Sequence, residues 1–292
     1  MALNIATFKT RAATAGVFVA VMLAGLLWNQ WSFFILFSII HFGCWTEYQK
    51  LVCLIDKEYT DISTFHKYGV MIAGWCIMLY FTNDSFSIFG IKLNAVGWWL
   101  GLIAVFVLPV SELLLAKQLE LKNIAYSAFG LLYISLSLGL MMDIRYFGES
   151  WMTNKGNVFE MGFILALGII FSIWINDTMA YIVGSLVGKT PFSKISPKKT
   201  WEGTAGGAVL CVVVISLITY WLGLSWKDGA IIAAIVAVFG TMGDLFESKL
   251  KRMAGVKDSG SIMPGHGGFL DRFDSLLLAT PFVWLYIALV MR

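Results

Sequence analysis

Charged residues are scarce in this chain: they make up 13% of its 292 residues, whereas 59% of the residues are hydrophobic. About a quarter of the residues of a soluble globular domain are charged, and about half are apolar. This composition, together with a mean hydropathy of +0.78, therefore excludes an ordinary soluble fold. The sequence predicts an integral membrane protein.

Cysteine and histidine are also scarce, with four and three residues. The cysteines lie in or beside apolar segments without metal-ligand spacing, which is typical of small buried hydrophobic side chains. His41 and His66 lie far in sequence from His266, so no zinc-ligand pattern is present. The sequence also lacks a recognisable nucleic-acid-binding module, so we expect no nucleic-acid partner.

Nine apolar segments approach the length of roughly 17–25 residues that spans a bilayer as a helix. Most of the 21 Lys and Arg residues fall in alternate loops, which favours a cytoplasmic N-terminus and an odd number of spans. The predicted fold class is therefore all-α, a polytopic membrane protein with about nine transmembrane helices. No A-x-A-like site follows the first apolar run, so we expect no cleaved signal peptide. The predicted spans are residues 12–28, 31–49, 68–83, 94–116, 123–142, 160–186, 203–223, 228–247 and 273–291.

The sequence contains no internal repeat and no low-complexity linker, so we expect residues 1–292 to form a single membrane domain. Its two parts nevertheless differ in composition. Residues 1–155 are apolar spans with short mixed-charge loops, whereas residues 156–292 contain most of the polar groups that are costly in a membrane. The first part is predicted to be a scaffold and the second to be catalytic.

The segment between residues 248 and 274 is the most informative part of the chain. It interrupts the apolar runs with SKLKRMAGVKDSGSIMPGHGGFLDRFD, in which basic residues, glycines and aspartates are interleaved. Basic side chains bind phosphates, glycines allow close backbone approach, and paired carboxylates hold divalent cations. The segment therefore predicts a phosphate and metal site at the membrane surface.

Four aspartates lie in or at the ends of predicted spans: Asp177, Asp244, Asp271 and Asp274. Carboxylates are costly inside a membrane and usually have a partner or an ion. Asp271 and Asp274 are three residues apart, so a helix there would present both on one face. A purely structural role, as salt-bridge partners of nearby Lys or Arg residues, stays open for each of them.

Two further signals lie outside that set. SPKKTWEG, at residues 196–203, offers Lys198 and Lys199 as ammonium donors to phosphate oxygens. The same two lysines also suit a purely topological role on the cytoplasmic side of the membrane. His266 is a candidate proton shuttle, phosphate donor or loop hydrogen-bond former, and we favour a phosphate or backbone contact.

At these residues the chain resembles phosphatidate cytidylyltransferases, which are also called CDP-diacylglycerol synthases. The resemblance is close over residues 160–292, whereas the first part of the chain is similar in hydropathy alone. Met263 stands where the family usually has Leu or Ile, a departure that changes no charge. The matching positions are Ser248, Lys251, Arg252, Lys257, Asp258, Pro264, His266, Gly267, Gly268, Asp271, Arg272 and Asp274, with Asp177, Ala180, Tyr181, SPKKTWEG, Gly243 and Asp244 upstream.

The resemblance implies an enzyme that joins CTP and phosphatidic acid into CDP-diacylglycerol and releases pyrophosphate. It also implies a multi-span fold, a requirement for Mg²⁺ and a homodimer. We expect the protein in a bacterial inner membrane, with the active site on the cytoplasmic side, where the distribution of Lys and Arg places the basic loops. A second, monovalent cation is a further candidate cofactor. By position, Asp244 and Asp271 would be the metal ligands, with Asp274 or Asp177 completing the shell.

The chemistry of this reaction suits the predicted residues. The lipid phosphate is already anionic, so the difficulty lies in bringing two anions together, and cations address it. The residues expected to act in catalysis are Lys199, Lys251, Arg252, Lys257, His266 and Arg272. Those expected to bind substrate are Lys198, Ser248, Asp258, Gly267, Gly268 and Asp177.

Two other functions remain open at this point. The nearer is another CTP-dependent or lipid-phosphate enzyme, such as a polyprenol kinase-like transferase or an isoprenoid-lipid cytidylyltransferase. The second is an ion-coupled transporter, whose intramembrane carboxylates would bind ions. Transporters often contain paired repeats with matching broken helices, and the sequence has no such pairing.

Overall fold

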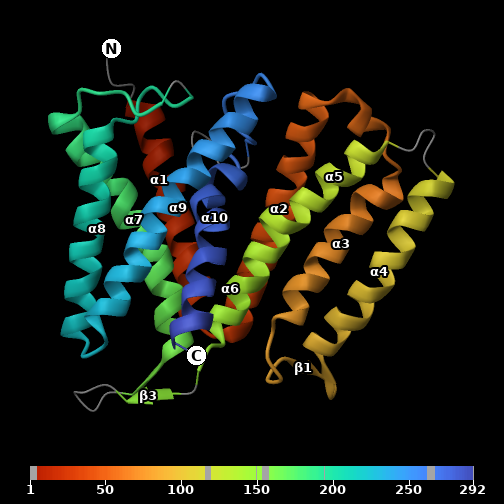
Figure 1. Ribbon diagram of the computed structural model, residues 1–292, viewed down its shortest axis with the longest axis horizontal. Helices are drawn as coiled ribbons and strands as arrows, with labels where there is room; N and C mark the ends of the chain where they lie inside the picture. Colours follow the sequence, from red (N-terminus) through yellow and green to blue (C-terminus); the bar gives the residue numbers. More distant parts are fainter. Residues whose placement is uncertain are drawn as a thin grey trace. The chain divides into compact units, whose positions relative to one another are not determined.

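The computed structural model describes residues 5–115, 120–148, 150–152, 158–193, 195–261 and 267–291. Within these ranges the chain is mainly helical (Figure 1). Its strands form two short antiparallel hairpins of two strands each. The prediction of an all-α membrane protein is confirmed. The elements are α1 (Ile5–Leu27), α2 (Gln30–Ile55), η1 (Lys57–Asp61), α3 (Thr64–Tyr80), β1 (Ser87–Ile88), β2 (Ile91–Lys92), α4 (Leu93–Leu115), α5 (Leu121–Gly130), η2 (Leu131–Leu136), α6 (Ser137–Arg145), β3 (Ser150–Met152), β4 (Val158–Glu160), α7 (Met161–Val187), α8 (Trp201–Trp221), α9 (Trp226–Met253), α10 (Leu270–Tyr286) and η3 (Ile287–Met291).

Six helical segments in the described residues are long and apolar enough to cross a membrane. Two of them are composite, because α5, η2 and α6 form one run, as do α10 and η3. The first three predicted spans are helical as well, in α1, α2 and α3, but these helices are not among the six. The total of nine spans and the cytoplasmic N-terminus therefore stay predictions. The six segments are Leu93–Leu115, Leu121–Arg145, Met161–Val187, Trp201–Trp221, Trp226–Met253 and Leu270–Met291.

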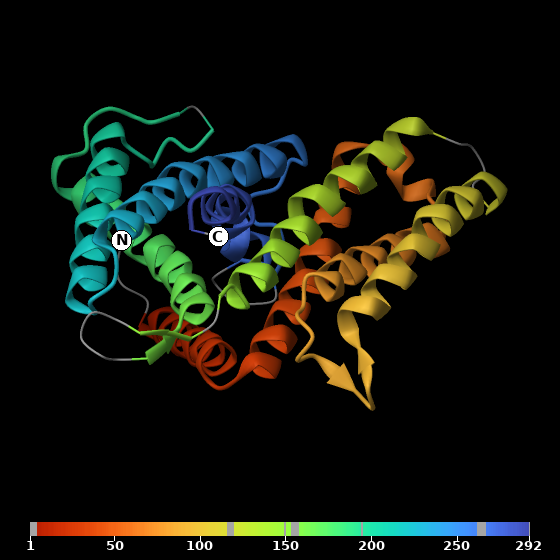
Figure 2. The same cartoon turned by 60° about the horizontal axis from the view of Figure 1, so that its bottom comes forward.

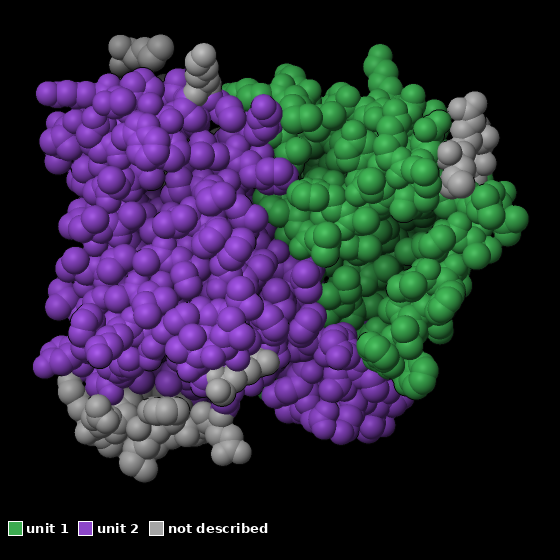
Figure 3. All heavy atoms as spheres, in the orientation of Figure 1, with its two compact units in different colours: residues 1–77, 97–135, 250–273 green, residues 78–96, 136–249, 274–292 purple. Residues whose placement is uncertain are grey.

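The chain divides into two compact units, which Figure 3 colours separately. Unit 1 consists of residues 1–77, 97–135 and 250–273, and unit 2 consists of residues 78–96, 136–249 and 274–292. Each unit draws on both parts of the sequence, so the boundary predicted near residue 155 does not coincide with this division. The single membrane domain stays a prediction.

Unit 1 is organised around the polar and aromatic face of α2. The N-terminus of α2 is fixed by a capping box, in which Asn29 and Ser32 exchange side-chain and backbone hydrogen bonds of 2.9 and 3.0 Å. Further along the helix, the indole of Trp45 donates to Ser135 Oγ at 2.8 Å, and the Tyr48 hydroxyl donates to the Tyr126 carbonyl at 2.8 Å. Both rings are fully buried, so α2 supplies the core of this unit.

Unit 2 contains a tightly packed pair of helices. Helices α7 and α8 lie side by side in both ribbon views (Figures 1 and 2), and small residues fill their contact. A Cβ added at Gly203 would lie 2.8 Å from the Ala180 carbonyl oxygen, and one at Gly207 would lie 2.7 Å from the Ala180 nitrogen. These glycines therefore allow α7 and α8 to approach each other closely.

The four cysteines are free, as their spacing predicts. Cys44, Cys76 and Cys211 are buried, and Cys53 is partly buried. Cys211 belongs to a small apolar cluster of unit 2, and its thiol lies 3.2 Å from the Ser172 carbonyl oxygen. Their packing fits the prediction of buried hydrophobic side chains.

Candidate active site

In unit 2, Lys199 forms an ion pair with Asp244. Both side chains are about one third exposed, at 32% and 29%. Asp244 lies on α9 and Lys199 precedes α8, so the pair joins two segments that the sequence analysis expected to form one site. The Lys199 ammonium is therefore positioned by a carboxylate and can be shared with an anionic ligand.

The loop that presents Lys199 is built by local hydrogen bonds. Thr200 caps α8, because its hydroxyl accepts from the Gly203 N–H at 3.1 Å. On the other side of the loop, Glu202 accepts from the backbone N–H of Lys189 and Thr190 at 3.2 and 3.1 Å. The loop is therefore tied to the first turn of α8 at both ends.

Lys198, the other predicted phosphate donor of this loop, has an exposed side chain. Its predicted role in substrate binding has no contact that supports or opposes it. The last three residues of SPKKTWEG form the first turn of α8, because the helix begins at Trp201 with Thr200 as its N-cap.

Carboxylates gather near the Lys199–Asp244 pair. Asp274 has Asp244, Glu247 and Asp177 as electrostatic neighbours. Asp177, in turn, has Lys199 and Asp244 as neighbours. Three aspartates of the predicted site in unit 2 are therefore neighbours of one another, together with Glu247, which is fully buried.

A glycine lets α9 approach α10 at this point. A Cβ added at Gly243 would overlap the carbonyl oxygen of Asp274, so any larger residue would separate the two helices. Asp274 itself is 7% exposed, and the Ser275 N–H donates to its Oδ1 at 2.6 Å. The close contact at Gly243 thus keeps Asp244 and Asp274 near one another.

In unit 1, Asp271 is the centre of a dense hydrogen-bond network. Lys251 Nζ lies 2.5 Å from its Oδ1. Its Oδ2 accepts from the Ser259 N–H and hydroxyl at 2.9 Å each, and from the Gly268 N–H at 2.8 Å. The helical placement of Asp271 one turn before Asp274 is confirmed, because α10 begins at Leu270.

Glu47 of α2 binds the same segment, although no sequence motif singled it out. Its carboxylate accepts from the Phe269 N–H at 2.9 Å, from the Leu270 N–H at 2.8 Å and from the Ser259 hydroxyl at 2.7 Å. The signal was present: an acidic residue inside a predicted apolar span usually has a partner. Glu47 belongs to the part of the chain that was predicted to be a scaffold.

The glycines of this segment have a steric role that the structure makes plain. A Cβ added at Gly268 would overlap both carboxylate oxygens of Glu47, and one at Gly260 would overlap Glu47 Oε1. Gly267 has a φ of +81° and leaves 2.5 Å between an added Cβ and Asp271 Oδ2. Gly267 and Gly268 were predicted to bind substrate, a role that no contact tests.

The C-terminus of α9 ends in a Schellman motif. Gly255 has a φ of +71°, its N–H donates to the Arg252 carbonyl at 3.1 Å, and the Val256 N–H donates to the Lys251 carbonyl at 2.9 Å. Lys251 and Arg252 lie in the last turn, where cations are favoured by the helix dipole. The motif thus fixes where α9 stops and where Lys251 stands.

The remaining predicted residues are brought into fewer contacts. Arg252 donates to the Val256 carbonyl at 3.3 Å, and Ser248 is partly buried in α9. Lys257, Asp258 and Arg272 are exposed. His266 and Pro264 lie outside the described residues, so the predicted roles of His266 stay predictions.

The donor chemistry of unit 2 fits a hard divalent cation, because aspartate and glutamate oxygens are the ligands that Mg²⁺ prefers. In the described part of the chain, no group of three or more His, Cys, Asp or Glu side chains is close enough to hold a metal ion as it stands. Asp244 is paired with a lysine instead. The assignment of Mg²⁺ therefore stays a prediction.

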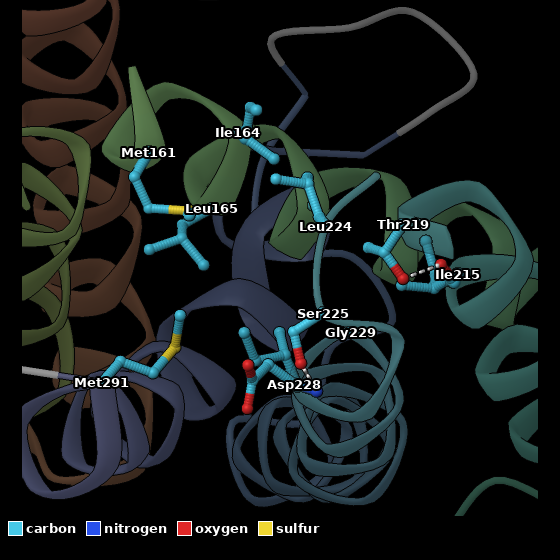
Figure 4. Close-up of a pocket in the computed structure, with 12 residues that line it drawn as sticks. Met161, Ile164, Leu165, Ile215, Thr219, Leu224, Ser225, Asp228, Gly229 and Met291 are labelled. Atoms are coloured by element: carbon cyan, nitrogen blue, oxygen red, sulfur yellow. Dashed lines mark hydrogen bonds between the residues drawn. The ribbon is translucent and has the colours of Figure 1, made fainter. Parts of the chain in front are cut away.

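A small pocket of unit 2 lies away from these groups. Figure 4 shows Met161, Leu165 and Leu224 around a space of about 80 Å³, with Asp228 at its side. Its walls come from the start of α7, the end of α8 and the start of α9, whereas Asp177 and Asp244 lie in the opposite halves of α7 and α9. None of the predicted site residues lines this pocket.

Comparison with known sequences identifies relatives over most of the chain. A model of the cytidylyltransferase family matches residues 9–290. A phosphatidate cytidylyltransferase of Haemophilus influenzae is 30% identical over 291 residues, which cover 94% of this chain and 96% of that protein. One of Bacillus subtilis is 35% identical over 193 residues, which cover 65% of this chain and 68% of that protein.

A plant relative is longer. The chloroplastic phosphatidate cytidylyltransferase 5 of Arabidopsis thaliana is 36% identical over 202 residues, which cover 64% of this chain. The match spans only 50% of that protein, so this chain spans about half the length of that relative.

Proposed function

Because this chain belongs to the cytidylyltransferase family, we propose that it transfers CMP from CTP to phosphatidic acid, giving CDP-diacylglycerol and pyrophosphate. Phosphatidate cytidylyltransferase is the name of the bacterial and plant relatives described above. The proposal makes the protein a nucleotidyltransferase of phospholipid biosynthesis.

One observation carries this proposal: two lysines of the predicted site are each held by an aspartate. Lys199 pairs with Asp244 in unit 2, and Lys251 pairs with Asp271 in unit 1. An ammonium group held in this way is oriented before substrate arrives, and it can exchange a carboxylate partner for a phosphate oxygen. Two such groups suit a reaction that must bring two phosphate-bearing substrates together.

The transfer itself needs little covalent chemistry from the protein. A phosphate oxygen of phosphatidic acid attacks the α-phosphorus of CTP, a new P–O bond forms, and the bond to the pyrophosphate leaving group breaks. That oxygen is already anionic near neutral pH, so no strong general base is required. Lys199 and Lys251 stabilise the growing negative charge, with Arg252, Lys257 and Arg272 as further donors to the phosphates.

Magnesium is part of the proposal, with Asp244 as its principal ligand and Asp274 beside it. When bound there, Mg²⁺ would neutralise the triphosphate and favour departure of pyrophosphate. Asp271 is the second ligand that the resemblance implies, and within unit 1 its carboxylate is held by Lys251, Ser259 and Gly268. Asp177 would complete or orient the shell, and a monovalent cation is a further candidate.

The setting of the reaction is proposed from the apolar helices and the bacterial relatives. One substrate is a lipid and the other is soluble, so the site has to open to a leaflet and to water. We expect nine spans, a cytoplasmic N-terminus and a site on the cytoplasmic side of a bacterial inner membrane. This orientation follows the distribution of Lys and Arg. A homodimer is also expected, as the resemblance implies.

Product formation by purified protein in detergent tests this function. CTP radiolabelled at its α-phosphorus is supplied with phosphatidic acid or, in a parallel reaction, with a polyprenyl phosphate. We expect label in the lipid extract of the reaction with phosphatidic acid and not in that of the reaction with polyprenyl phosphate. An equal amount of pyrophosphate should form with the labelled lipid. Label in the polyprenyl lipid but not in the phosphatidic acid reaction would instead assign an isoprenoid cytidylyltransferase. Since detergent removes any membrane gradient, product formation would also exclude a transporter.

A further inference from the structure

We infer that Glu47 is a positioning residue for the transfer reaction: a carboxylate of α2 that holds the start of α10 and, through Ser259, the side chain of Asp271. This inference rests on the proposed function. It assigns a role to a residue of the first 155 residues, which the sequence predicts to be a scaffold. Glu47 lies in unit 1 together with all of its partners.

Glu47 binds the helix start directly. The first N–H groups of a helix have no intrahelical partner, so they need an external acceptor when they are buried. Phe269 and Leu270 lie at the start of α10, and their N–H groups donate to the two different oxygens of Glu47, at 2.9 and 2.8 Å. A carboxylate at this end is also favoured by the helix dipole.

Ser259 links Glu47 to Asp271. The Ser259 hydroxyl oxygen lies 2.7 Å from Glu47 Oε2 and 2.9 Å from Asp271 Oδ2. A hydroxyl has one hydrogen, so it donates to one of these carboxylates at a time. The Ser259 N–H also donates to Asp271 Oδ2, at 2.9 Å. A displacement of Ser259 therefore changes what Asp271 accepts.

The fit around Glu47 is too close to be a general packing effect. Its side chain enters a space that exists only because residues 260 and 268 are glycines, since a Cβ at either position would overlap the Glu47 carboxylate. Glu47 itself is 5% exposed. The backbone of this segment is thus shaped around one side chain that comes from a distant part of the sequence.

The hydrogen bonds on Oδ2 of Asp271 determine how its other oxygen, Oδ1, meets Lys251. With Oδ2 held by Ser259 and Gly268, the carboxylate presents Oδ1 to Lys251 at 2.5 Å. Loss of the Glu47 contacts would release the start of α10 and let Asp271 rotate. Lys251 would then lose the fixed partner that orients its ammonium group for phosphate.

Glu47→Gln is the variant that tests this role. Glutamine keeps the size of the side chain but has only one oxygen that can accept. Its NH₂ group would lie against a backbone N–H that also donates, so at least one hydrogen bond is lost. We expect kcat to fall about 10- to 100-fold, as for other residues that orient a catalytic group through a hydrogen bond. We expect KM for CTP to stay within about twofold, because Glu47 does not touch substrate.

Gln49→Leu is the matched control. Gln49 lies on the same helix, is 2% exposed and donates its amide to the Lys67 carbonyl at 2.9 Å, away from the α10 start. Its replacement removes a buried polar group of similar size, and we expect kcat near that of the wild type. Amide hydrogen exchange, measured on peptides that cover residues 267–271, should be faster in Glu47→Gln and unchanged in Gln49→Leu.

The outcomes separate the inference from the proposed function. Unchanged exchange, or faster exchange with the kcat of the wild type, would overturn the positioning role. Absence of CDP-diacylglycerol from the wild type would overturn the proposed function, and exchange would still show whether Glu47 holds the α10 start. If Glu47→Gln does not accumulate folded, Ser259→Ala replaces it. That variant keeps Glu47, removes the shared hydroxyl and should lower kcat by a smaller factor, and a kcat equal to that of the wild type would contradict the role.

Discussion

The two units both contain acidic residues, but these residues have different surroundings. In unit 2, Asp177, Asp244 and Asp274 are neighbours of one another, and Asp244 is paired with a lysine. In unit 1, Glu47 and Asp271 accept N–H and O–H groups of the backbone and of a serine. The first group concentrates negative charge, whereas the second has its negative charge satisfied by hydrogen bonds.

This difference indicates two roles for the carboxylates, which are to bind a cation in unit 2 and to fix the backbone in unit 1. Carboxylates that face one another in a membrane are costly unless a cation joins them. Carboxylates that accept several hydrogen bonds fix a backbone segment. We therefore expect charge-removing substitutions at Asp177, Asp244 and Asp274 to impair the reaction more than folding, and those at Glu47 and Asp271 to impair both.

The largest effect is expected for Asp244→Asn. The change keeps the size of the side chain but removes the charge that a divalent cation requires, so turnover should fall roughly 100-fold or more. Asp228→Asn is the matched control on the same helix, because the Asp228 Oδ1 accepts from the Tyr286 hydroxyl at 2.6 Å beside the small pocket. Initial rates with phosphatidic acid should separate the two variants, and equal rates would show that the reaction does not depend on the charge of Asp244.

Asp271→Asn should lower both turnover and stability. The two oxygens of Asp271 accept hydrogen bonds from Lys251, Ser259 and Gly268. The asparagine amide has only one oxygen, so at least one of these donors is left without an acceptor. A cost of about 1–3 kcal/mol in the free energy of unfolding is expected for such a loss. Thermal unfolding in detergent should thus show a lower Tm for Asp271→Asn than for Asp244→Asn. The opposite order would mean that the carboxylates of unit 2 hold the fold.

Lys199→Ala should lower turnover about 10- to 100-fold, since an oriented donor to a developing negative charge is lost. Turnover should also become more dependent on added Mg²⁺, because Asp244 has lost the Lys199 ammonium group as its partner. Lys227→Ala, at the other end of α9, is the control and should have the turnover of the wild type. A Lys199→Ala protein with full activity would leave the lysine with a topological role alone.

The smallest effect is expected at the hairpin of unit 2. A hydrogen bond from Lys92 at 2.5 Å, with a second from Asn94 at 3.0 Å, lowers the pKa of Asp84 below its usual value. A lowered folded-state pKa contributes stability that is present above the unfolded pKa of about 3.9 and is lost as the pH falls through the folded value. Asp84→Asn should therefore reduce Tm slightly at neutral pH and not at all at strongly acid pH. A difference that grows on acidification would contradict this sign.

The sequence predicts the helices of the second part of the chain well. Long apolar runs with polar ends are sufficient to locate them, and the predicted spans 160–186 and 203–223 differ by only one or two residues at each end from α7 (Met161–Val187) and α8 (Trp201–Trp221). The hairpins β1–β2 and β3–β4 were not predicted, because two or three paired residues leave no periodic pattern.

The site was predicted in part. Lys199, Asp244 and Asp274 converge as the motif indicated, because their segments surround one end of the α7–α8–α9 group. Glu47 stands out as an acidic residue in a predicted span, but its partners lie more than 200 residues away in the sequence, so no local pattern identifies them. For the same reason the sequence does not indicate that Gly268 leaves room for this carboxylate, and its predicted role in substrate binding stays a prediction.

Binding of Mn²⁺, followed by electron paramagnetic resonance of the purified protein, tests the central comparison most directly. Mn²⁺ has the same preference for oxygen ligands as Mg²⁺ and can be observed without turnover. The account predicts that the wild type and Asp228→Asn bind Mn²⁺ alike and that Asp244→Asn loses most of this binding. Undiminished Mn²⁺ binding by a folded Asp244→Asn protein would contradict the assignment of the cation to the carboxylates of unit 2.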